Sequence, residues 1–147
     1  MRLIAFLALL TCFGGQAWAW GEGDQENQVP IATIILEAQG EPFNGQVAVG
    51  EVIRNRVSKR WSTPRRVCLA PKQFSCWNQT AWFEERLRLV SKSVHEVAID
   101  AWAKSATSDL THGATHYFNP RLAKPSWARK MVKTVTIGSH EFYREGV

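Results

Sequence analysis

The apolar residues between positions 31 and 57 recur with the period of a helix, in two separate blocks. In the first block, isoleucine and alanine occupy positions 31, 34, 35 and 38, the i, i+3, i+4, i+7 spacing of one helix face. Pro30 precedes them, where a first-turn proline is tolerated. Gly40 and Pro42 then end the helix, and residues 45 to 57 repeat the helical spacing. The pattern predicts a helical hairpin with Glu37 and Glu41 at its elbow.

The rest of the hydrophobic pattern predicts further helices and then strands. Residues 62 to 64, Ser-Thr-Pro, begin a short helical turn that runs to Leu69, and residues 84 to 106 carry an apolar stripe of helical period. The alternating ATHYF of residues 114 to 118 predicts a strand, and KTVTIGSHEFY of residues 133 to 143 predicts two strands joined at Gly138-Ser139. This order indicates an α+β domain that is mainly helical, with a small antiparallel sheet near the C-terminus.

The N-terminal residues predict an export signal. Arg2 precedes an apolar run from Leu3 to Phe13, and Ala17-Trp18-Ala19 offers a small-x-small cleavage site. The run is too short to span a bilayer comfortably. We expect cleavage after Ala19, with a lipoprotein signal acylated at Cys12 as the alternative, although Thr11 is a poor residue just before such a cysteine. The mature protein is then expected in the periplasm or outside the cell, with no membrane span.

Composition divides the remaining chain into a tail and one domain. Residues 20 to 28, WGEGDQENQ, have no apolar period and are interpreted as a flexible polar tail. Residues 29 to 147 are long enough for one hydrophobic core, and they carry seventeen Lys and Arg against ten Asp and Glu, a formal charge of +7. Such a surface favours a polyanionic partner. Nucleic acid is not expected as the partner of an exported chain, so we expect an anionic cell-wall polymer.

Two cysteines, Cys68 and Cys76, remain after the predicted processing, in an export context that permits oxidation. Because there are only two, a disulfide between them has no competing connectivity. Closing this short loop would stabilise the fold by about 2 to 3 kcal/mol in the chain-entropy model. The disulfide is therefore the expectation, and two free thiols are the alternative.

Two sets of residues are candidates for chemistry. Glu37 and Glu41 are four residues apart, and Glu37 lies at the edge of the apolar helix face, where partial desolvation raises the pKa of a carboxyl group toward the range of a general acid. His112, His116 and His140 could instead hold zinc in an amidase-like site. The strand-like pattern there argues against a helical histidine pair, and the chain contains no zinc signature. The carboxylates are the favoured set.

Several segments together resemble one known family. They are EAQGEPFNGQVAVGEVIRNRV from residue 37, QFSCW from residue 73, ATHYFNP from residue 114, Trp127, and IGSHEFY from residue 137. In order and spacing they are similar to the catalytic domain of SleB/CwlJ-type cell wall hydrolases, over residues 31 to 143. The resemblance implies a lysozyme-like fold and a lytic transglycosylase that cleaves peptidoglycan glycan strands without a metal or another cofactor.

The resemblance also implies roles for individual residues. In such enzymes one glutamate protonates the glycosidic oxygen between N-acetylmuramic acid and N-acetylglucosamine and then deprotonates the muramoyl C6 hydroxyl, so a second catalytic carboxylate is not required, unlike in ordinary glycosidases. Glu37 matches this glutamate, and Glu41 matches a second one that would support the turn or bind sugar. The remaining candidates for lining the cleft, packing or stacking on sugar are Tyr117, His140, Tyr143, Phe74 and Trp127. Core packing is the favoured interpretation of the last two.

Three alternative functions stay open at this point. A hydrolytic muramidase would use the same acid with water, a zinc-dependent amidase would release peptides, and a non-catalytic wall-binding module would need only the basic surface and the aromatic residues. We expect the protein to act as a monomer. Spore-lytic members of the family carry a peptidoglycan-binding module ahead of the catalytic domain, whereas here only a signal and a short tail precede it. This difference favours a general envelope role or a phage-type lysis role.

Overall fold

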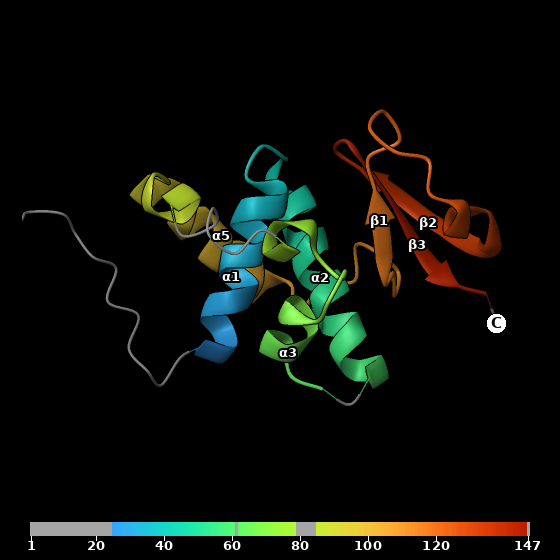
Figure 1. Cartoon of the computed structure of the whole chain (residues 1–147), viewed down its shortest axis with the longest axis horizontal. Helices are drawn as coiled ribbons and strands as arrows, with labels where there is room; N and C mark the ends of the chain where they lie inside the picture. Colours follow the sequence, from blue (N-terminus) through green and yellow to red (C-terminus); the bar gives the residue numbers. More distant parts are fainter. Residues whose placement is uncertain (1–24, 61, 79–84, 147) are drawn as a thin grey trace, which may run out of the picture.

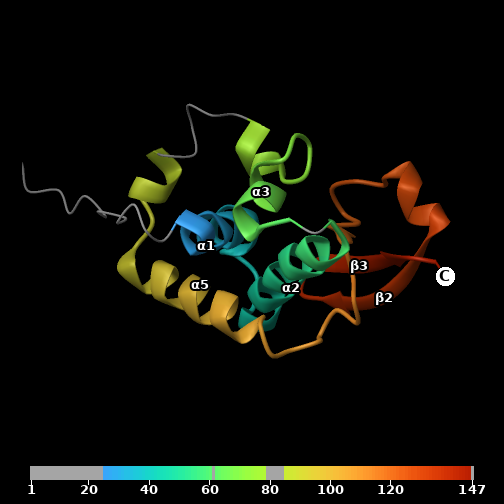
Figure 2. The same ribbon diagram turned by 90° about the horizontal axis from the view of Figure 1, so that it is seen from below.

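The computed structural model describes residues 25 to 60, 62 to 78 and 85 to 146. The α-helices gather on one side of the molecule, and the sheet stands on the other side, next to α2 (Figures 1 and 2). The helices are α1 (Gln25–Ala38), α2 (Phe43–Arg60), α3 (Pro64–Leu69) and α5 (Lys92–Lys104). The strands are β1 (His116–Phe118), β2 (Met131–Ile137) and β3 (His140–Glu145), with short 3-10 helices η2 (Ser75–Asn78) and η3 (Ser126–Lys130). The predicted α+β class is confirmed.

The central element is α1, which packs against α2, α3 and α5. All four positions of its predicted apolar face are buried. Ala32, Thr33 and Leu36 are buried as well, so the helix is enclosed on nearly every side. Glu37 is half-buried one residue before the helix ends. The carboxyl group of Glu37 therefore lies at the edge of the hydrophobic core.

The helix begins earlier than predicted. It starts at Gln25, so residues 25 to 28 are helical and are not part of a flexible tail, and Pro30 lies inside the helix and not in its first turn. A tertiary contact explains the extension, because Trp102 Nε1 of α5 donates a hydrogen bond of 2.9 Å to Asn27 Oδ1. Composition alone could not reveal this partner, which is 75 residues away in the chain.

The predicted signal peptide, residues 1 to 19, lies outside the described residues, as do the alternative acylation site Cys12 and the first part of the predicted tail. Within the residues that the structure describes, no helix is long and apolar enough to cross a membrane.

The two predicted helical segments beyond α2 have different outcomes. The turn from Thr63 to Leu69 is confirmed as α3, with Pro64 in its first turn and Thr63 Oγ1 accepting a capping hydrogen bond of 3.3 Å from the N–H of Arg66. The predicted continuous helix over residues 84 to 106 is wrong, because a helical turn at residues 85 to 88 ends before α5 begins. Ser91 explains the restart, since its Oγ caps α5 by accepting the N–H of Val94.

The sheet is antiparallel with the strand order β1-β3-β2. Tyr117 of β1 lies opposite Phe142 of β3, and Ile137 of β2 pairs with His140 of β3, so Gly138-Ser139 is the two-residue turn that the sequence predicts. Gly138 has a φ of +58°, which L side chains rarely adopt. A Cβ at this position would also collide with the carboxylate of Glu41. The hairpin tip therefore approaches the helical elbow closely because residue 138 is glycine.

Polar side chains of α2 hold the segment that leads into β1. The carboxylate of Glu51 is 3% exposed and accepts three hydrogen bonds of 2.8 to 2.9 Å from Leu110 and Thr111. One turn later, Asn55 Nδ2 donates to the backbone oxygen of Ala114 at 2.9 Å. Buried donors and acceptors that are fully paired specify a single arrangement. These contacts fix where β1 enters the fold, and therefore where its side chains meet α1.

Candidate active site

Glu37 is the residue around which three elements converge. Its Oε1 accepts hydrogen bonds from Ser75 Oγ at 3.1 Å and from the backbone N–H of Cys76 at 3.0 Å, both in η2. Its Oε2 accepts a hydrogen bond of 3.3 Å from the hydroxyl of Tyr117 in β1. Both carboxyl oxygens are thus oriented by groups that α1 does not supply. Such support holds a reactive group in a defined geometry.

The loop that carries Ser75 is itself fixed on the core. Phe74 is 3% exposed and belongs to the main hydrophobic cluster. Trp77 packs against the same cluster, and its Nε1 donates a hydrogen bond of 2.9 Å to Thr33 Oγ1 of α1. These aromatic residues pack on the core, as the sequence analysis favoured for Phe74. Their contribution to the site is to hold Ser75 and the backbone of Cys76 against Glu37.

Tyr117 links the sheet to the same carboxylate. Burial raises the pKa of the Tyr117 hydroxyl well above 10, and the negative charge of Glu37 raises it further. The hydroxyl therefore remains protonated and keeps donating to Glu37. The ring stacks on Phe142, with centroids 5.6 Å apart, and meets the edge of His140 at 5.1 Å. Packing on both sides leaves the Tyr117 ring little freedom to move.

Glu41 has a different set of contacts. Its Oε2 accepts the backbone N–H of Ser139 at 2.8 Å, its Oε1 accepts the hydroxyl of Ser139, and His140 Nδ1 lies 3.6 Å from Oε1. Burial alone would raise the pKa of the Glu41 carboxyl group. The two hydrogen bonds from Ser139 and the nearby His140 outweigh that effect and hold the pKa below its ordinary value of 4.5. Ionised Glu41 therefore connects the helical elbow to the β2–β3 hairpin through hydrogen bonds.

The two glutamates are joined by a path of side chains. Glu37 accepts a hydrogen bond from Tyr117, the ring of Tyr117 contacts the ring of His140, and His140 lies beside Glu41. The structure therefore brings together four of the residues that the sequence predicts for the site. Their catalytic and binding roles stay predictions.

Tyr143 and Trp127 lie elsewhere. Adjacent residues of a strand point to opposite faces, so Tyr143 faces away from Phe142 and Tyr117. Its ring stacks on Phe118 at 5.4 Å and meets Trp127 at 5.6 Å. On this outer face of the sheet the two rings form an aromatic cluster that has no contact with Glu37. A sugar-stacking role for them stays a prediction, and it would involve this outer face.

The predicted disulfide is wrong, because Cys68 and Cys76 are free thiols in the structure. Burial raises the pKa of the Cys68 thiol to about 12, and Thr33 hydrogen-bonds to this thiol. Burial, followed by the charge of Glu37, raises the pKa of Cys76, whose thiol hydrogen-bonds to Glu37. Each thiol therefore hydrogen-bonds to a residue of α1. The loop that the disulfide was expected to close is held by packing and hydrogen bonds instead.

The three histidines considered for zinc are dispersed. His112 is exposed and lies 3.9 Å from Asp109. The ring of His116 lies 5.1 Å from that of Trp127, tilted against it, on the outer face of the sheet, and His140 contacts Glu41. Over residues 25–60, 62–78 and 85–146, no group of three or more His, Cys, Asp or Glu is placed to hold a metal ion.

Sequence reasoning missed Ser75 as a partner of Glu37. The QFSCW segment was singled out for its cysteine and its aromatic residues, while the serine and a backbone N–H make the polar contacts. The sequence does show that Ser75 is a small polar residue between Phe74 and Cys76, two residues that were expected to hold this loop in place. Only the packing of η2 on α1 shows which group that serine reaches.

Fold and site define an α+β domain in which a central helix presents one half-buried glutamate beside a small antiparallel sheet. The chain belongs to the cell wall hydrolase family, whose profile matches residues 40–143. Glu41 lies within that range, and Glu37 precedes its first residue by three positions.

Named relatives agree with this assignment. A spore cortex-lytic enzyme of Bacillus cereus is 31% identical over 124 residues, which cover 83% of this chain and 45% of the relative. The spore cortex-lytic enzyme of Bacillus subtilis is 30% identical over 124 residues, covering 83% of this chain and 38% of the relative. The chain thus spans less than half the length of these relatives.

Solved structures are similar over most of the chain. The catalytic domain of the Bacillus cereus SleB protein has a TM-score of 0.64 at 27% identity, covering 84% of this chain and 93% of that domain. The catalytic domain of the germination-specific lytic transglycosylase SleB from Bacillus anthracis has a TM-score of 0.64 at 30% identity, covering 84% and 98%. The predicted resemblance to this family is confirmed.

Proposed function

We propose that this chain cleaves the β-1,4 bond between N-acetylmuramic acid and N-acetylglucosamine in peptidoglycan, as a lytic transglycosylase with Glu37 as acid and then base. One observation carries the proposal. Glu37 is the half-buried carboxyl group that donors from η2 and β1 orient, whereas Glu41 is committed to the hairpin. Membership of the cell wall hydrolase family and similarity to a domain described as a lytic transglycosylase support it.

The proposed reaction needs one carboxyl group in two protonation states. Protonated Glu37 gives its proton to the glycosidic oxygen, so the C1–O bond of the muramoyl residue breaks and N-acetylglucosamine leaves with a hydroxyl group. The muramoyl C6 hydroxyl then attacks C1 and closes a 1,6-anhydro ring, and its proton returns to the Glu37 carboxylate. No water is consumed. The substrate supplies the nucleophile, so the second carboxylate of ordinary glycosidases is not needed.

The two oxygens of Glu37 are oriented by different elements. Oε1 accepts hydrogen bonds of 3.1 and 3.0 Å from Ser75 Oγ and the Cys76 N–H of η2, and Oε2 accepts one of 3.3 Å from the Tyr117 hydroxyl of β1. Donors fixed in this way hold a reacting carboxyl group in one geometry. In the proposed reaction Tyr117 therefore acts as a positioning residue for Glu37.

The proposal implies a place of action. Peptidoglycan lies outside the cytoplasm, so a chain that cleaves it works in the periplasm or in the cell wall. The basic character of the chain, with a formal net charge of +5, is compatible with binding to this anionic polymer.

The test is a pair of glutamate variants assayed on purified peptidoglycan. Glu37→Gln removes the proton donor and keeps the shape, so we expect turbidity loss to slow by about 100-fold or more, the usual range for a general acid. Glu96→Gln is the matched control, because Glu96 is an exposed glutamate of α5 that pairs only with Lys92 among the described residues. It should clear the wall at the wild-type rate. Far-UV circular dichroism checks that both variants fold.

Product analysis by mass spectrometry separates the remaining functions. Anhydromuramoyl ends, lighter by one water than reducing ends, are the expected products. Reducing muramic ends would replace the transglycosylase with a hydrolytic muramidase, and released peptides with intact glycan would indicate an amidase. Full activity of Glu37→Gln would refute the assignment of the acid. Wall binding without any clearing by the wild type would refute enzymatic function altogether.

A further inference from the structure

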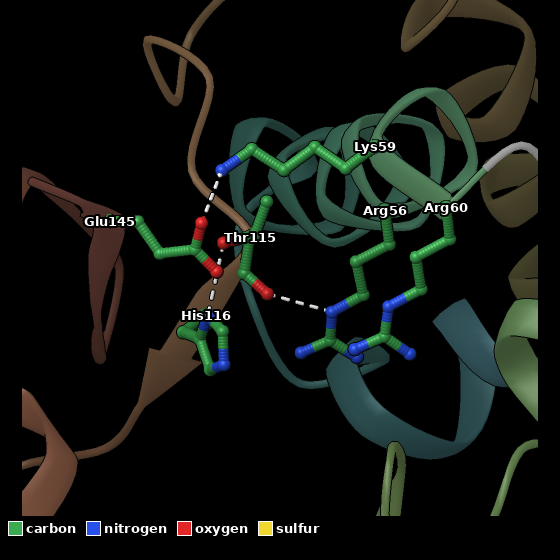
Figure 3. Close-up of a pocket in the computed structure, with 6 residues that line it drawn as sticks. All are labelled: Arg56, Lys59, Arg60, Thr115, His116 and Glu145. Atoms are coloured by element: carbon green, nitrogen blue, oxygen red, sulfur yellow. Dashed lines mark hydrogen bonds and ion pairs between the residues drawn. The ribbon is translucent and has the colours of Figure 1, made fainter. Parts of the chain in front are cut away.

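A basic pocket lies between the C-terminal end of α2 and the sheet (Figure 3). Its volume is about 290 Å³, near the lower limit of small-ligand sites. Cationic side chains reach it from α2, and the other lining residues come from β1, the residue before it, and the end of β3. The lining residues are Arg56, Lys59, Arg60, Thr115, His116 and Glu145.

The pocket carries more positive charge than it can neutralise internally. Three permanent cations line it against one carboxylate, a formal excess of two. Lys59 Nζ pairs with Glu145 Oε2 at 3.0 Å. Arg60, also at the end of α2, forms no hydrogen bond or ion pair with any residue in the described part of the chain. Local charge of this kind attracts an anion.

Arg56 is the buried member of this set, with 7% of its surface exposed. Its Nε donates to the backbone oxygen of Thr115 at 2.7 Å and its Nη1 to that of Gln73 at 3.2 Å, while the guanidinium lies 4.8 Å above the ring of Phe74. Burial lowers the pKa of Arg56. No carboxylate among the described residues forms an ion pair with it, although the charge of Glu37 acts on it from beyond ion-pair distance and partly restores its pKa. A buried cation that lacks a directly paired counter-ion is costly, and a bound anion would offset that cost.

The pocket and Glu37 share two structural segments. The loop at residues 73 to 76 contacts Arg56 through Gln73 and Phe74, and it contacts Glu37 through its next two residues. In β1, His116 lines the pocket while Tyr117 donates to Glu37. The pocket therefore borders the loop and the strand that hold Glu37, with His116 on the opposite face of β1 from Tyr117, and its Arg56 is close enough to feel the charge of Glu37. A ligand group bound there would belong to the substrate close to the scissile bond.

We propose that this pocket binds a free carboxylate of the stem peptide that the muramoyl residue carries. The inference rests on the proposed function, because the peptide hangs from the same sugar whose glycosidic bond would be cleaved. Arg56 and Arg60 suit a carboxylate, because a guanidinium group can donate two parallel hydrogen bonds to its two oxygens. The volume holds the end of a short peptide and not a polymer. The protein would then prefer glycan strands whose stem peptides still carry a free carboxylate.

The test uses the wild-type chain and a free stem tetrapeptide, followed by two-dimensional NMR of the labelled protein. The peptide has no glycosidic bond, so binding is measured independently of cleavage. We expect shifts at Thr115 and His116, and about tenfold weaker binding of the same peptide with its carboxylates amidated. Arg60→Gln should weaken binding about fivefold. Lys104→Gln, the same loss of charge at an exposed position of α5, should leave binding unchanged.

Three other results would overturn the inference, and a fourth would overturn the proposed cleavage instead. Equal affinity for the amidated peptide, or for Arg60→Gln and wild type, would show that no carboxylate is recognised there. Shifts at the pocket with polyglycerol phosphate but not with the peptide would assign the pocket to a phosphate polymer. Clearing of peptidoglycan without peptide binding would remove this inference alone. Carboxylate-dependent peptide binding without clearing would keep the pocket and remove the proposed cleavage.

Discussion

Replacing Glu41 by glutamine tests the conclusion that this residue stabilises the fold by holding the β2–β3 hairpin against the helical elbow. The Glu41 side chain is 12% exposed, and it accepts one hydrogen bond from the backbone N–H of Ser139 and one from the Ser139 hydroxyl. Glutamine keeps one acceptor oxygen, and its amide NH₂ faces the other donor. Loss of the charge and of one charge-assisted hydrogen bond should cost about 2 kcal/mol. For a domain of this size that lowers Tm by about 8 °C at pH 7.

The pH dependence has a definite sign. Because the folded-state pKa of Glu41 lies below 4.5, its unfolded value, the ionised group stabilises the fold at any pH above that value. The contribution is lost as the pH falls through the folded pKa. The Tm difference between wild type and Glu41→Gln should therefore be constant from pH 7 to about pH 5 and shrink below about pH 4.5. Glutamine does not titrate, so the change comes from the wild type.

Thermal unfolding followed by circular dichroism measures this difference, with Glu96→Gln as the control for loss of an exposed charge. A double-mutant cycle with Ser139→Ala isolates the contact, and we expect the combined variant to lose clearly less than the sum of the two single changes. Clearing of peptidoglycan well below Tm should stay within a few-fold of wild type. The stabilising role of Glu41 would be refuted if the Tm difference between wild type and Glu41→Gln stayed unchanged down to about pH 3.5. It would also be refuted if the losses in the double-mutant cycle with Ser139→Ala were additive. Activity lost as completely as in Glu37→Gln would make Glu41 a catalytic residue.

Two further predictions concern the surroundings of Glu37. Tyr117→Phe removes one hydrogen bond of 3.3 Å, so kcat for wall cleavage should fall about tenfold. KM should be nearly unchanged, and an equal rise in KM would indicate a binding role instead. Burial raises the pKa of Cys68 to about 12 and also raises that of Cys76, so both thiols should resist alkylation at pH 8 in the folded protein and react after unfolding. Rapid native labelling at either position, mapped by mass spectrometry, would contradict this.

The sequence predicted the features that depend on local periodicity and turn chemistry. The apolar face of α1, the capped start of α3 at Thr63 and the Gly138-Ser139 hairpin follow from neighbours within a few residues, and all three are in the structure. The glutamate at the end of α1 was identified for the same reason, because its place on the helix is a local property. These positions need no knowledge of tertiary contacts.

The missed features all depend on distant partners. Glu51 and Arg56 of α2 are charged, yet both are buried, because Leu110, Thr111 and Thr115 supply their hydrogen-bond partners. The disulfide was inferred from chain spacing and export, neither of which describes how two side chains are oriented. The same limit applies to the pocket, since it forms only where α2 meets the sheet.

The contrast between the two glutamates bears on the mechanism. Glu41, with a pKa below 4.5, is ionised at neutral pH and has no proton to give. Both of its oxygens already accept hydrogen bonds from Ser139, so it is also poorly placed to attack a sugar carbon or to activate a water. We therefore propose Glu37, and not Glu41, as the acid–base residue of the elbow. A site with one working carboxyl group favours a reaction in which the substrate provides its own nucleophile, and the C6 hydroxyl of the muramoyl residue meets that requirement.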